Sequence, residues 1–551
     1  MRAPPPILAA LLTVTVVHLP TGWGLIAAST GEADNHHKML WVALQQALDR
    51  PGPWSNLPDG LDLPLMDPVN LPLYAAGAWL DPTLGYNLVG FGNGLLAFFG
   101  AWALARALEV PPWGAVTAGV AAASAPFLAG ATAFGITEAL PVGWIGLFAA
   151  ASLRAARSGR WGHWTLAGLA LAAFVGAGWY HAVFGLIAAA VVSAWALRRA
   201  PVRRTVAGLL AAGGVALIPI LPRFLHFLAL KSQWADRWSA PGVVPPGEGW
   251  RHTPLFGTDL LNLVLPAVER VPVSKSVYLG LVALGLALAA GRSARWLWAA
   301  CAPLWTLALG PWLRVAGHPV LPEIGLPALW LTQAFPALEG LSHWHRAAGP
   351  ATVFLAVAAG LGAARLAARW PRTAPLWPAL LLIDALAFSQ TPWPRPAYDP
   401  RPPAALMALE GPGALVQLPF NNGRTEFGIE PPRIYDRWQP FHGRPITEND
   451  EGRDAALTKN RLVAVADALC GVPSALPARR RAPADLTRIQ ALEQPGAVEA
   501  SIAQLQDWGV GWVVLHRDRA RTPDAAAALL QRTLGPPIVA EPDLAIWAVP
   551  P

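Results

Sequence analysis

The chain has 551 residues, of which 54% are hydrophobic and 14% are charged. A soluble domain carries about 25% charged residues, so the composition excludes an ordinary water-soluble globular protein and makes lipid the expected solvent. The formal net charge of +7 is compatible with nucleic-acid binding, but we interpret it as arginine in the short cytoplasmic turns of a membrane protein. No nucleic-acid partner is therefore expected.

Apolar runs along the chain predict about eleven transmembrane helices, since a span needs about 20 apolar residues. The runs cover residues 7–28, 86–107, 113–131, 138–153, 164–179, 181–197, 205–222, 276–290, 296–312, 350–368 and 374–390. Residues 324–338 are also apolar, but Pro327 and Pro336 interrupt them. We expect a re-entrant or interfacial segment there, with a full span as the alternative.

The arginines predict how the spans are oriented. Every second connection is basic, and the short alternate connections at 132–137 and 178–180 carry no Lys or Arg. Because basic turns stay inside, we expect a cytoplasmic N-terminus and outer loops at 29–85, 223–275 and 314–349. The first run follows Arg2 and could be a signal peptide, but Pro20 and Trp23 fit that interpretation poorly, so we expect a retained span.

Three domains are predicted. Residues 1–390 form a transmembrane domain, residues 391–412 a Pro-rich linker, and residues 413–551 a small α/β domain on the extracytoplasmic side. In the last domain, strand-like alternation covers 414–418, 511–515 and 544–549, and helical periodicity covers 455–469, 502–508 and 523–534. No Gly-rich phosphate loop follows any of these strands, so the pattern does not predict nucleotide binding.

Candidate acids lie in the predicted outer connections. Glu32 and Asp34 closely follow the first span and precede an amphipathic helical pattern. An acid at that depth is partly desolvated, which moves its pKa toward that of a general base; the structural alternative is that Asp34 caps the helix and pairs with Lys38. Asp67 is either a turn former or a residue that assists at a site. Glu138 starts a span, as a functional or a capping carboxylate.

Cationic residues gather just before a late span, at His343, His345 and Arg346. Arginine makes forked, charge-assisted bonds to phosphate oxygens, so the cluster predicts phosphate or diphosphate binding, with interfacial anchoring as the alternative. The histidines also raise the question of zinc, but no HExxH or CxxC pattern is present. A divalent metal ion at Asp34 stays open as an alternative.

This arrangement resembles the bacterial polytopic glycosyltransferases of the GT-C superfamily. The resemblance covers most of the chain and rests on loose motifs. They are the acidic stretch Glu32-Ala33-Asp34, residues 57–62 leading to 82–87, residues 256–261 leading to Pro266, and Trp344-His345-Arg346. Residues 441–446 in the tail add to it.

The resemblance implies an inverting hexosyl- or pentosyltransferase in the bacterial inner membrane. Its donor is a polyprenyl-phosphate sugar held in the lipid bilayer, and its acceptor is a hydroxyl of a glycan, lipid or protein. By position, Asp34 matches the acid that acts as base or metal ligand, with Glu32 as its partner. Arg346, helped by His345, stabilises the departing phosphate. The remaining expected substrate contacts are His343, Glu138 and Asp67.

Two other functions are compatible with the sequence. A transporter or flippase for a lipid or polysaccharide predicts ionisable residues in mid-span; Asp384 and His18 are the clearest, and no repeat is visible. A non-catalytic membrane scaffold with the same fold predicts that the outer acids are dispensable.

Overall fold

A computed structural model describes most of the chain. The described residues are 3–18, 25–26, 28, 32–50, 67–238, 257–266, 277–321, 324–335, 338, 341, 343–389, 391, 393–419, 434–446, 460–470, 492–520 and 522–550. The chain divides into two compact units. The first combines Met1–Ser29 with Pro64–Tyr398, and the second combines Thr30–Leu63 with Asp399–Pro551. A segment from near the N-terminus therefore belongs to the same unit as the C-terminal residues.

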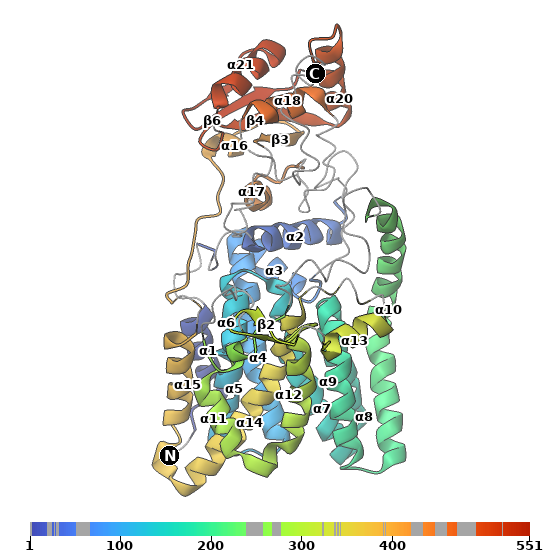
Figure 1. The fold of residues 1–551 in the computed structure, drawn as a ribbon, viewed down its shortest axis with the longest axis vertical. Helices are drawn as coiled ribbons and strands as arrows, with labels where there is room; N and C mark the ends of the chain where they lie inside the picture. The colour runs from blue at the N-terminus through green and yellow to red at the C-terminus, as the bar shows by residue number, and fades with distance from the viewer. Residues whose placement is uncertain are drawn as a thin grey trace. The chain divides into compact units, whose positions relative to one another are not determined.

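The first unit is built from helices (Figure 1). They are α1 (Pro6–His18), α3 (Leu71–Ala78), α4 (Pro82–Ala107), α5 (Pro112–Ala123), α6 (Pro126–Ala133), η1 (Thr137–Ala139), α7 (Gly143–Ser158), α8 (Trp161–Gly176), α9 (Trp179–Leu197), α10 (Val202–Trp238), η2 (Leu261–Leu263), α11 (Leu281–Ala289), η4 (Gly291–Ala294), α12 (Arg295–Ala308), α13 (Pro327–Ala334), η6 (Trp344–Ala347), α14 (Ala348–Arg369), η7 (Pro371–Thr373) and α15 (Leu376–Ala387). A short hairpin joins β1 (Arg314–Val315) to β2 (His318–Pro319).

Six helical segments in the described residues are long and apolar enough to cross a membrane, by length and composition. They are Pro82–Ala107, Pro112–Ala133, Thr137–Ser158, Tyr180–Leu197, Val202–His226 and Trp344–Arg369. The other predicted spans contain shorter helices, namely α1 with 13 residues, α8 with 16, α11 with 9, α12 with 14 and α15 with 12. The mostly helical fold class is confirmed, with six candidate membrane spans in the described residues, whereas the count of about eleven spans stays a prediction. The described part of residues 324–338 includes the short helix α13.

Helices of the first unit approach closely where glycine faces glycine. Helix α4 packs against α5 and α7, and α14 packs against α5 and α11. A Cβ added to Gly100 of α4 would lie 2.2 Å from the carbonyl oxygen of Gly143 in α7. Small residues at such crossings let two backbones pack in direct contact, which drives helix association where no hydrophobic effect operates between helices.

The predicted basic connections lie at one end of the first unit. Arg157 at the end of α7 pairs with Glu109 after α4, at 2.9 Å. Arg204 in α10 donates to the Ser158 carbonyl oxygen at 3.3 Å. Arg365 in the last part of α14 reaches the Ala289 carbonyl at the end of α11. These contacts join the ends of α4 and α7 to the start of α10, and the end of α11 to the last part of α14. The side of the membrane that these connections face stays a prediction.

The second unit contains a four-stranded sheet of order β3-β4-β6-β5. Its strands are β3 (Ala414–Leu418), β4 (Val510–His516), β5 (Val539–Ala540) and β6 (Leu544–Ala548). Its helices are α2 (Glu32–Ala47), α16 (Ala404–Met407), α17 (Ile434–His442), α18 (Arg461–Leu469), α20 (Ala497–Asp507) and α21 (Pro523–Leu534). Strands β3 and β4 are parallel, and β6 runs antiparallel to both β4 and β5. The small α/β region predicted for the C-terminal part is confirmed.

Each face of this sheet has its own core. Val416 and Val513 face one cluster with residues of α18, α20 and α21, whereas Leu415 and Val514 face another with residues of α16 and α17. Neighbouring strand residues point to opposite faces, so strands buried on both faces read as continuous apolar runs. Helix α2 packs on α17, which places the acid-bearing helix of the predicted first outer loop in this unit.

Candidate active site

Arg346 stands just before the N-terminus of α14, and its side chain is 8% exposed. Its guanidinium forms an ion pair with the carboxylate of Glu138 in η1, which is 12% exposed. The guanidinium carbon lies 4.7 Å from the ring centre of Tyr180 at the start of α9. The N-terminal end of a helix carries a partial positive charge, and here it lies beside the charge of an arginine. This combination favours the binding of an anion.

The predicted histidines lie beside this arginine. The hydroxyl of Tyr180 is 3.0 Å from Nδ1 of His343, and the rings of His343 and His345 are 5.6 Å apart in an edge-to-face arrangement. The structure therefore brings Arg346, His343 and His345 together, as their adjacency in the sequence predicts. It adds Tyr180, for which the only sequence signal is an aromatic residue in a connection without charge.

Asp67 and Asn70 form a second buried polar group in the same unit. The Nδ2 of Asn70 donates to Oδ2 of Asp67 at 2.8 Å and to the carbonyl oxygen of Thr137 at 3.0 Å. The Nδ2 of Asn93 in α4 donates to Oδ1 of Asn70 at 2.6 Å. Thr137 directly precedes Glu138, so the peptide between them connects the Asp67–Asn70 group to the ion pair of Glu138 with Arg346. The sequence signal for Asn93 is a polar residue inside an otherwise apolar helix.

The environment of Asp67 moves its pKa toward neutral pH. Burial raises the pKa of Asp67 to about 7, and the negative charge of Glu138 adds to this, against the hydrogen bonds from Asn70 and Thr137 that lower it. The Oδ1 atom of Asp67 is buried and has no hydrogen-bond partner in the described part of the chain. An acid with such a pKa is suited to accept or release a proton at physiological pH.

Asp34 is the third residue of α2 and belongs to the second unit. Its two carboxylate oxygens accept from Arg437 of α17, at 2.9 Å from Nε and 3.2 Å from Nη2. The Asp34 side chain is fully buried and that of Arg437 is 11% exposed. Next to this pair, the rings of His37 and Phe441 meet edge to face at 5.9 Å. Glu32 begins α2, and its side chain lies outside the described residues.

The described residues offer no group of three or more His, Cys, Asp or Glu side chains placed to hold a metal ion. Asp34 is paired with the guanidinium of Arg437. A metal ion at Asp34 would need further oxygen or nitrogen ligands, and a guanidinium is a cation that cannot serve as one. The predicted roles of Asp34 and Glu32 stay predictions.

Two other polar groups have structural partners. Asp259, in the stretch 256–261, accepts from the backbone N–H of Leu261 at 2.9 Å and of Gly317 at 2.7 Å, which ties it to the β1–β2 hairpin. Asp384 of α15 accepts from the hydroxyl of Tyr278 and from the N–H of Val282, both at 2.9 Å, and so caps the start of α11.

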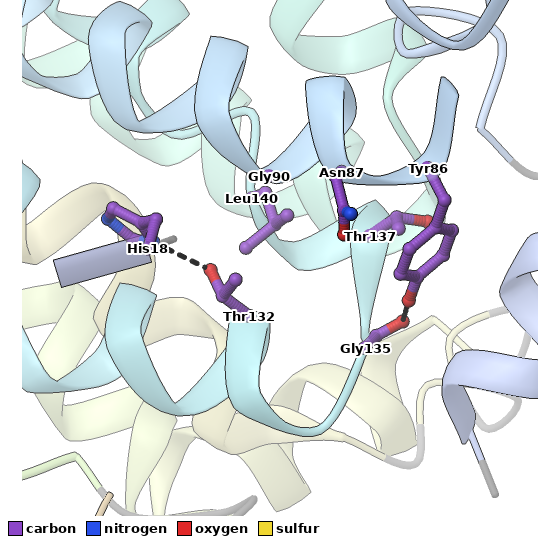
Figure 2. Close-up of a pocket in the computed structure, with 8 residues that line it drawn as sticks. All are labelled: His18, Tyr86, Asn87, Gly90, Thr132, Gly135, Thr137 and Leu140. Atoms are coloured by element: carbon purple, nitrogen blue, oxygen red, sulfur yellow. Dashed lines mark hydrogen bonds between the residues drawn. The ribbon is translucent and has the colours of Figure 1, made fainter. Parts of the chain in front are cut away.

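A small pocket lies next to the Asp67 group and is drawn in Figure 2. His18 borders it and is bonded to Oγ1 of Thr132 at 3.1 Å and to the Ala123 carbonyl at 2.9 Å. Tyr86 borders it and donates to the Gly135 carbonyl at 2.9 Å. Thr137 also borders the pocket, and its carbonyl is the one that Asn70 binds.

The first unit is helical, and six helical segments in its described part are long and apolar enough to cross a membrane. The chain is similar in structure to the arabinofuranosyltransferase AftD from Mycobacteria, with a TM-score of 0.54 and 16% identity over 99% of this chain. It spans 40% of the length of that protein. The expected resemblance to GT-C glycosyltransferases is confirmed at the level of the fold.

Two other solved structures match with lower TM-scores. ArnT from Cupriavidus metallidurans matches at 0.44, with 14% identity over 99% of this chain and 97% of that one. An oligosaccharyltransferase from Archaeoglobus fulgidus matches at 0.43, with 13% identity over 92% of this chain and 69% of that one. We base the fold assignment on the arabinofuranosyltransferase, because its TM-score exceeds 0.5. No protein-family model and no curated protein matches the sequence.

Proposed function

We propose that the protein transfers a sugar from a polyprenyl-phosphate carrier to an acceptor hydroxyl at the outer face of a bacterial inner membrane. A fold alone does not fix a function, so the proposal depends on the site. The observation that carries it is the buried Arg346 at the start of α14, stacked on Tyr180 and next to His343 and His345. These groups match the chemistry of a phosphate that leaves with increasing negative charge.

In the proposed reaction, the bond between the anomeric carbon and the carrier phosphate breaks, and a bond to the acceptor oxygen forms with inversion. The departing phosphate keeps the electron pair, and Arg346 and His345 stabilise its charge. Asp34, with Glu32 as its neighbour, takes the proton of the acceptor hydroxyl. His343, Glu138 and Asp67 are the proposed further substrate contacts.

The two ionisable residues within predicted spans that favour a transporter have structural roles in this fold. Asp384 caps α11 and binds Tyr278, and His18 joins α1 to α5 and α6 through Ala123 and Thr132. A transport pathway needs ionisable groups that exchange partners during the cycle. These bonds support transfer over transport.

The test is sugar transfer in reconstituted membranes that contain the whole chain. Polyprenyl-phosphate-linked arabinofuranose is the first donor to try, because the structurally similar protein is an arabinofuranosyltransferase; mannose and glucose donors follow. We expect Arg346→Ala to lower kcat by about 10²–10³-fold, the range for a lost charge-stabilising group, and Asp34→Asn by about 10²–10⁴-fold, the range for a lost general base. The two roles are tested separately, because the residues belong to different units.

Matched controls exist for both variants. Asp524 has a side chain that is 88% exposed, so Asp524→Asn controls for Asp34→Asn. The side chain of Arg401 is 52% exposed, so Arg401→Ala controls for Arg346→Ala. If both site variants equal the wild type while transfer is measurable, the site assignment is wrong. If no donor yields transfer, the non-catalytic scaffold function is favoured instead.

A further inference from the structure

The carboxyl ends of β3 and β4 carry two polar side chains on a mostly apolar sheet face. The two strands are parallel; Gln417 is the last residue but one of β3, and His516 is the last residue of β4. Side chains alternate along a strand, so both point to the face of Leu415 and Val514, against which residues of α17 pack. Ligands of α/β sheets bind at the carboxyl ends of parallel strands, so these two polar side chains stand where a ligand is expected.

Two aromatic rings of α17 hold His516, and His516 in turn holds Gln417. The imidazole stacks on Tyr435 with the ring centres 4.8 Å apart, and it lies 5.2 Å from the ring centre of Trp438. Nε2 of His516 donates to Oε1 of Gln417 at 3.1 Å. The nitrogen of the same amide, Nε2 of Gln417, is buried and has no hydrogen-bond partner in the described part of the chain. A buried donor of this kind is costly unless a further acceptor binds it.

Arg519, in the turn after β4, brings a positive charge to the same cluster. Its guanidinium carbon lies 5.8 Å from the ring centre of Tyr435 and 5.6 Å from that of Trp438, and its backbone N–H donates to the His516 carbonyl at 3.2 Å. The Nε of Arg519 is buried and has no hydrogen-bond partner among the described residues. Oδ2 of Asp518 is 3.8 Å from this Nε, which is too far for a hydrogen bond.

The guanidinium supplies the positive charge of this cluster. Burial, and next to it the positive charge of Arg519, lowers the pKa of His516 to about 3, so the imidazole is neutral at pH 7. The Arg519 side chain is 25% exposed, so the cluster is reached from solvent on that side. A positive charge beside N–H donors without acceptors matches an oxyanion, whose oxygens accept charge-assisted hydrogen bonds.

We propose that the carboxyl end of the β3–β4 pair binds an oxyanion, in the form of a phosphate, sulfate or carboxylate group, with Arg519 and the Nε2 of Gln417 as its donors. His516 is a positioning residue, because it engages the oxygen of the Gln417 amide and leaves the nitrogen to the ligand. The site lies in the second unit, and the inference does not rest on the proposed sugar transfer.

The experiment is calorimetric titration of the whole chain in lipid nanodiscs at pH 7. Sodium sulfate presents a tetrahedral oxyanion and sodium glucuronate a planar one. Sodium chloride at equal ionic strength controls for screening of surface charge, and glucose controls for binding of a neutral sugar. We expect saturable binding of at least one oxyanion, and none of chloride or glucose. Tighter binding of sulfate assigns the site to a phosphate or sulfate group, and tighter binding of glucuronate assigns it to a carboxylate.

Arg519→Met should weaken binding by about tenfold or more, where tenfold is equivalent to about 1.4 kcal/mol, because the charge and its donors are gone. Gln417→Glu keeps an oxygen for His516 but places a carboxylate where the ligand would bind. This variant should lose oxyanion binding, while its thermal stability in the same nanodiscs equals or exceeds that of the wild type. The matched controls are Arg532→Met and Gln531→Glu in α21, whose side chains are exposed and which should leave the affinity unchanged.

Two results overturn the inference. If neither oxyanion binds the wild type, or chloride gives the same heat at equal ionic strength, the site is not an oxyanion site, even if no variant can be purified. If Arg519→Met binds sulfate and glucuronate as tightly as the wild type does, the anions bind elsewhere in the chain, and the assignment to β3 and β4 is wrong.

Discussion

Arg437 holds Asp34 through two hydrogen bonds, although the two residues are separated by 403 positions in the sequence. The pair links α2, which follows the first predicted span, to α17 in the C-terminal part of the chain. The sequence predicts that Asp34 either caps its own helix and pairs with Lys38 or acts as a base with Glu32 as its partner. Its observed partner makes it part of the packing of the second unit, so Asp34 has a structural role besides the proposed role in chemistry.

Arg437→Ala should destabilise the second unit by about 3 kcal/mol, at the lower end of the cost of breaking a buried ion pair. Asp34 then loses its forked partner while its carboxylate stays fully buried. Arg437→Lys should lose less, because it keeps the charge but not the fork. Urea unfolding followed by Trp fluorescence measures the change, with the exposed Arg532 as the control site for Arg→Ala. Equal stability of the Arg437 and Arg532 variants would contradict a stabilising pair.

Asp384→Ala should destabilise the first unit by about 2 kcal/mol, because it removes the acceptor for the Tyr278 hydroxyl and the Val282 N–H. Tyr278→Phe removes one of these bonds and should cost about 1 kcal/mol. Neither change should affect the donor specificity of transfer. Thermal unfolding in detergent gives the stability. Were Asp384→Asn to abolish activity at unchanged stability, a functional role for this mid-helix acid would replace the capping role.

Gly143→Ala should disrupt the crossing of α4 and α7. The added Cβ would lie 2.2 Å from the Leu96 carbonyl oxygen, which is backbone and cannot rotate away. Overpacking of this kind costs about 1–3 kcal/mol. Gly213→Ala in α10 is the matched control, since its Cβ meets nothing within 4 Å and alanine is the better helix former by about 1 kcal/mol. The prediction fails if the two variants unfold at the same temperature.

The sequence could predict elements whose signals are local. The strand at 414–418 and the helix at 523–534 have the predicted bounds in the structure, because apolar alternation and a Pro near the helix start are read from neighbouring residues. The helix predicted at 502–508 starts earlier, at Ala497. Helix starts without a capping side chain, such as this one after Gly496, give little sequence signal.

The candidate site likewise has a part that local sequence signals predict and a part that they do not. The sequence could group Arg346, His343 and His345 because they lie within a few consecutive residues. Their contact with Glu138, and the link of Glu138 to Asp67, depend on how η1 packs against η6 and on the hydrogen bonds of Asn70. The pairing of Asp34 with Arg437 could not be predicted either, because nothing in the local pattern of α2 selects one arginine among those of the distant tail.

Asp67 should make stability depend on pH in a defined direction. Its pKa is about 7 in the folded protein, against about 3.9 for an unfolded chain. Between pH 4 and 7 the folded state therefore binds more protons than the unfolded state, so the free energy of unfolding falls as pH rises through this window and levels off above it. The difference of about three pKa units limits the total effect to about 4 kcal/mol.

Asp67→Asn removes this dependence while its side-chain oxygen can still accept from Asn70. We expect the variant to be more stable than the wild type at pH 8, with the difference shrinking toward pH 5. Urea unfolding at both pH values measures it, and Asp524→Asn at an 88% exposed side chain controls for loss of a carboxyl group. Glu138→Gln should shift the window to lower pH, because it removes the charge that helps to raise the pKa of Asp67. A stability difference between Asp67→Asn and wild type that is the same at pH 5 and pH 8 would mean that Asp67 does not titrate in this range.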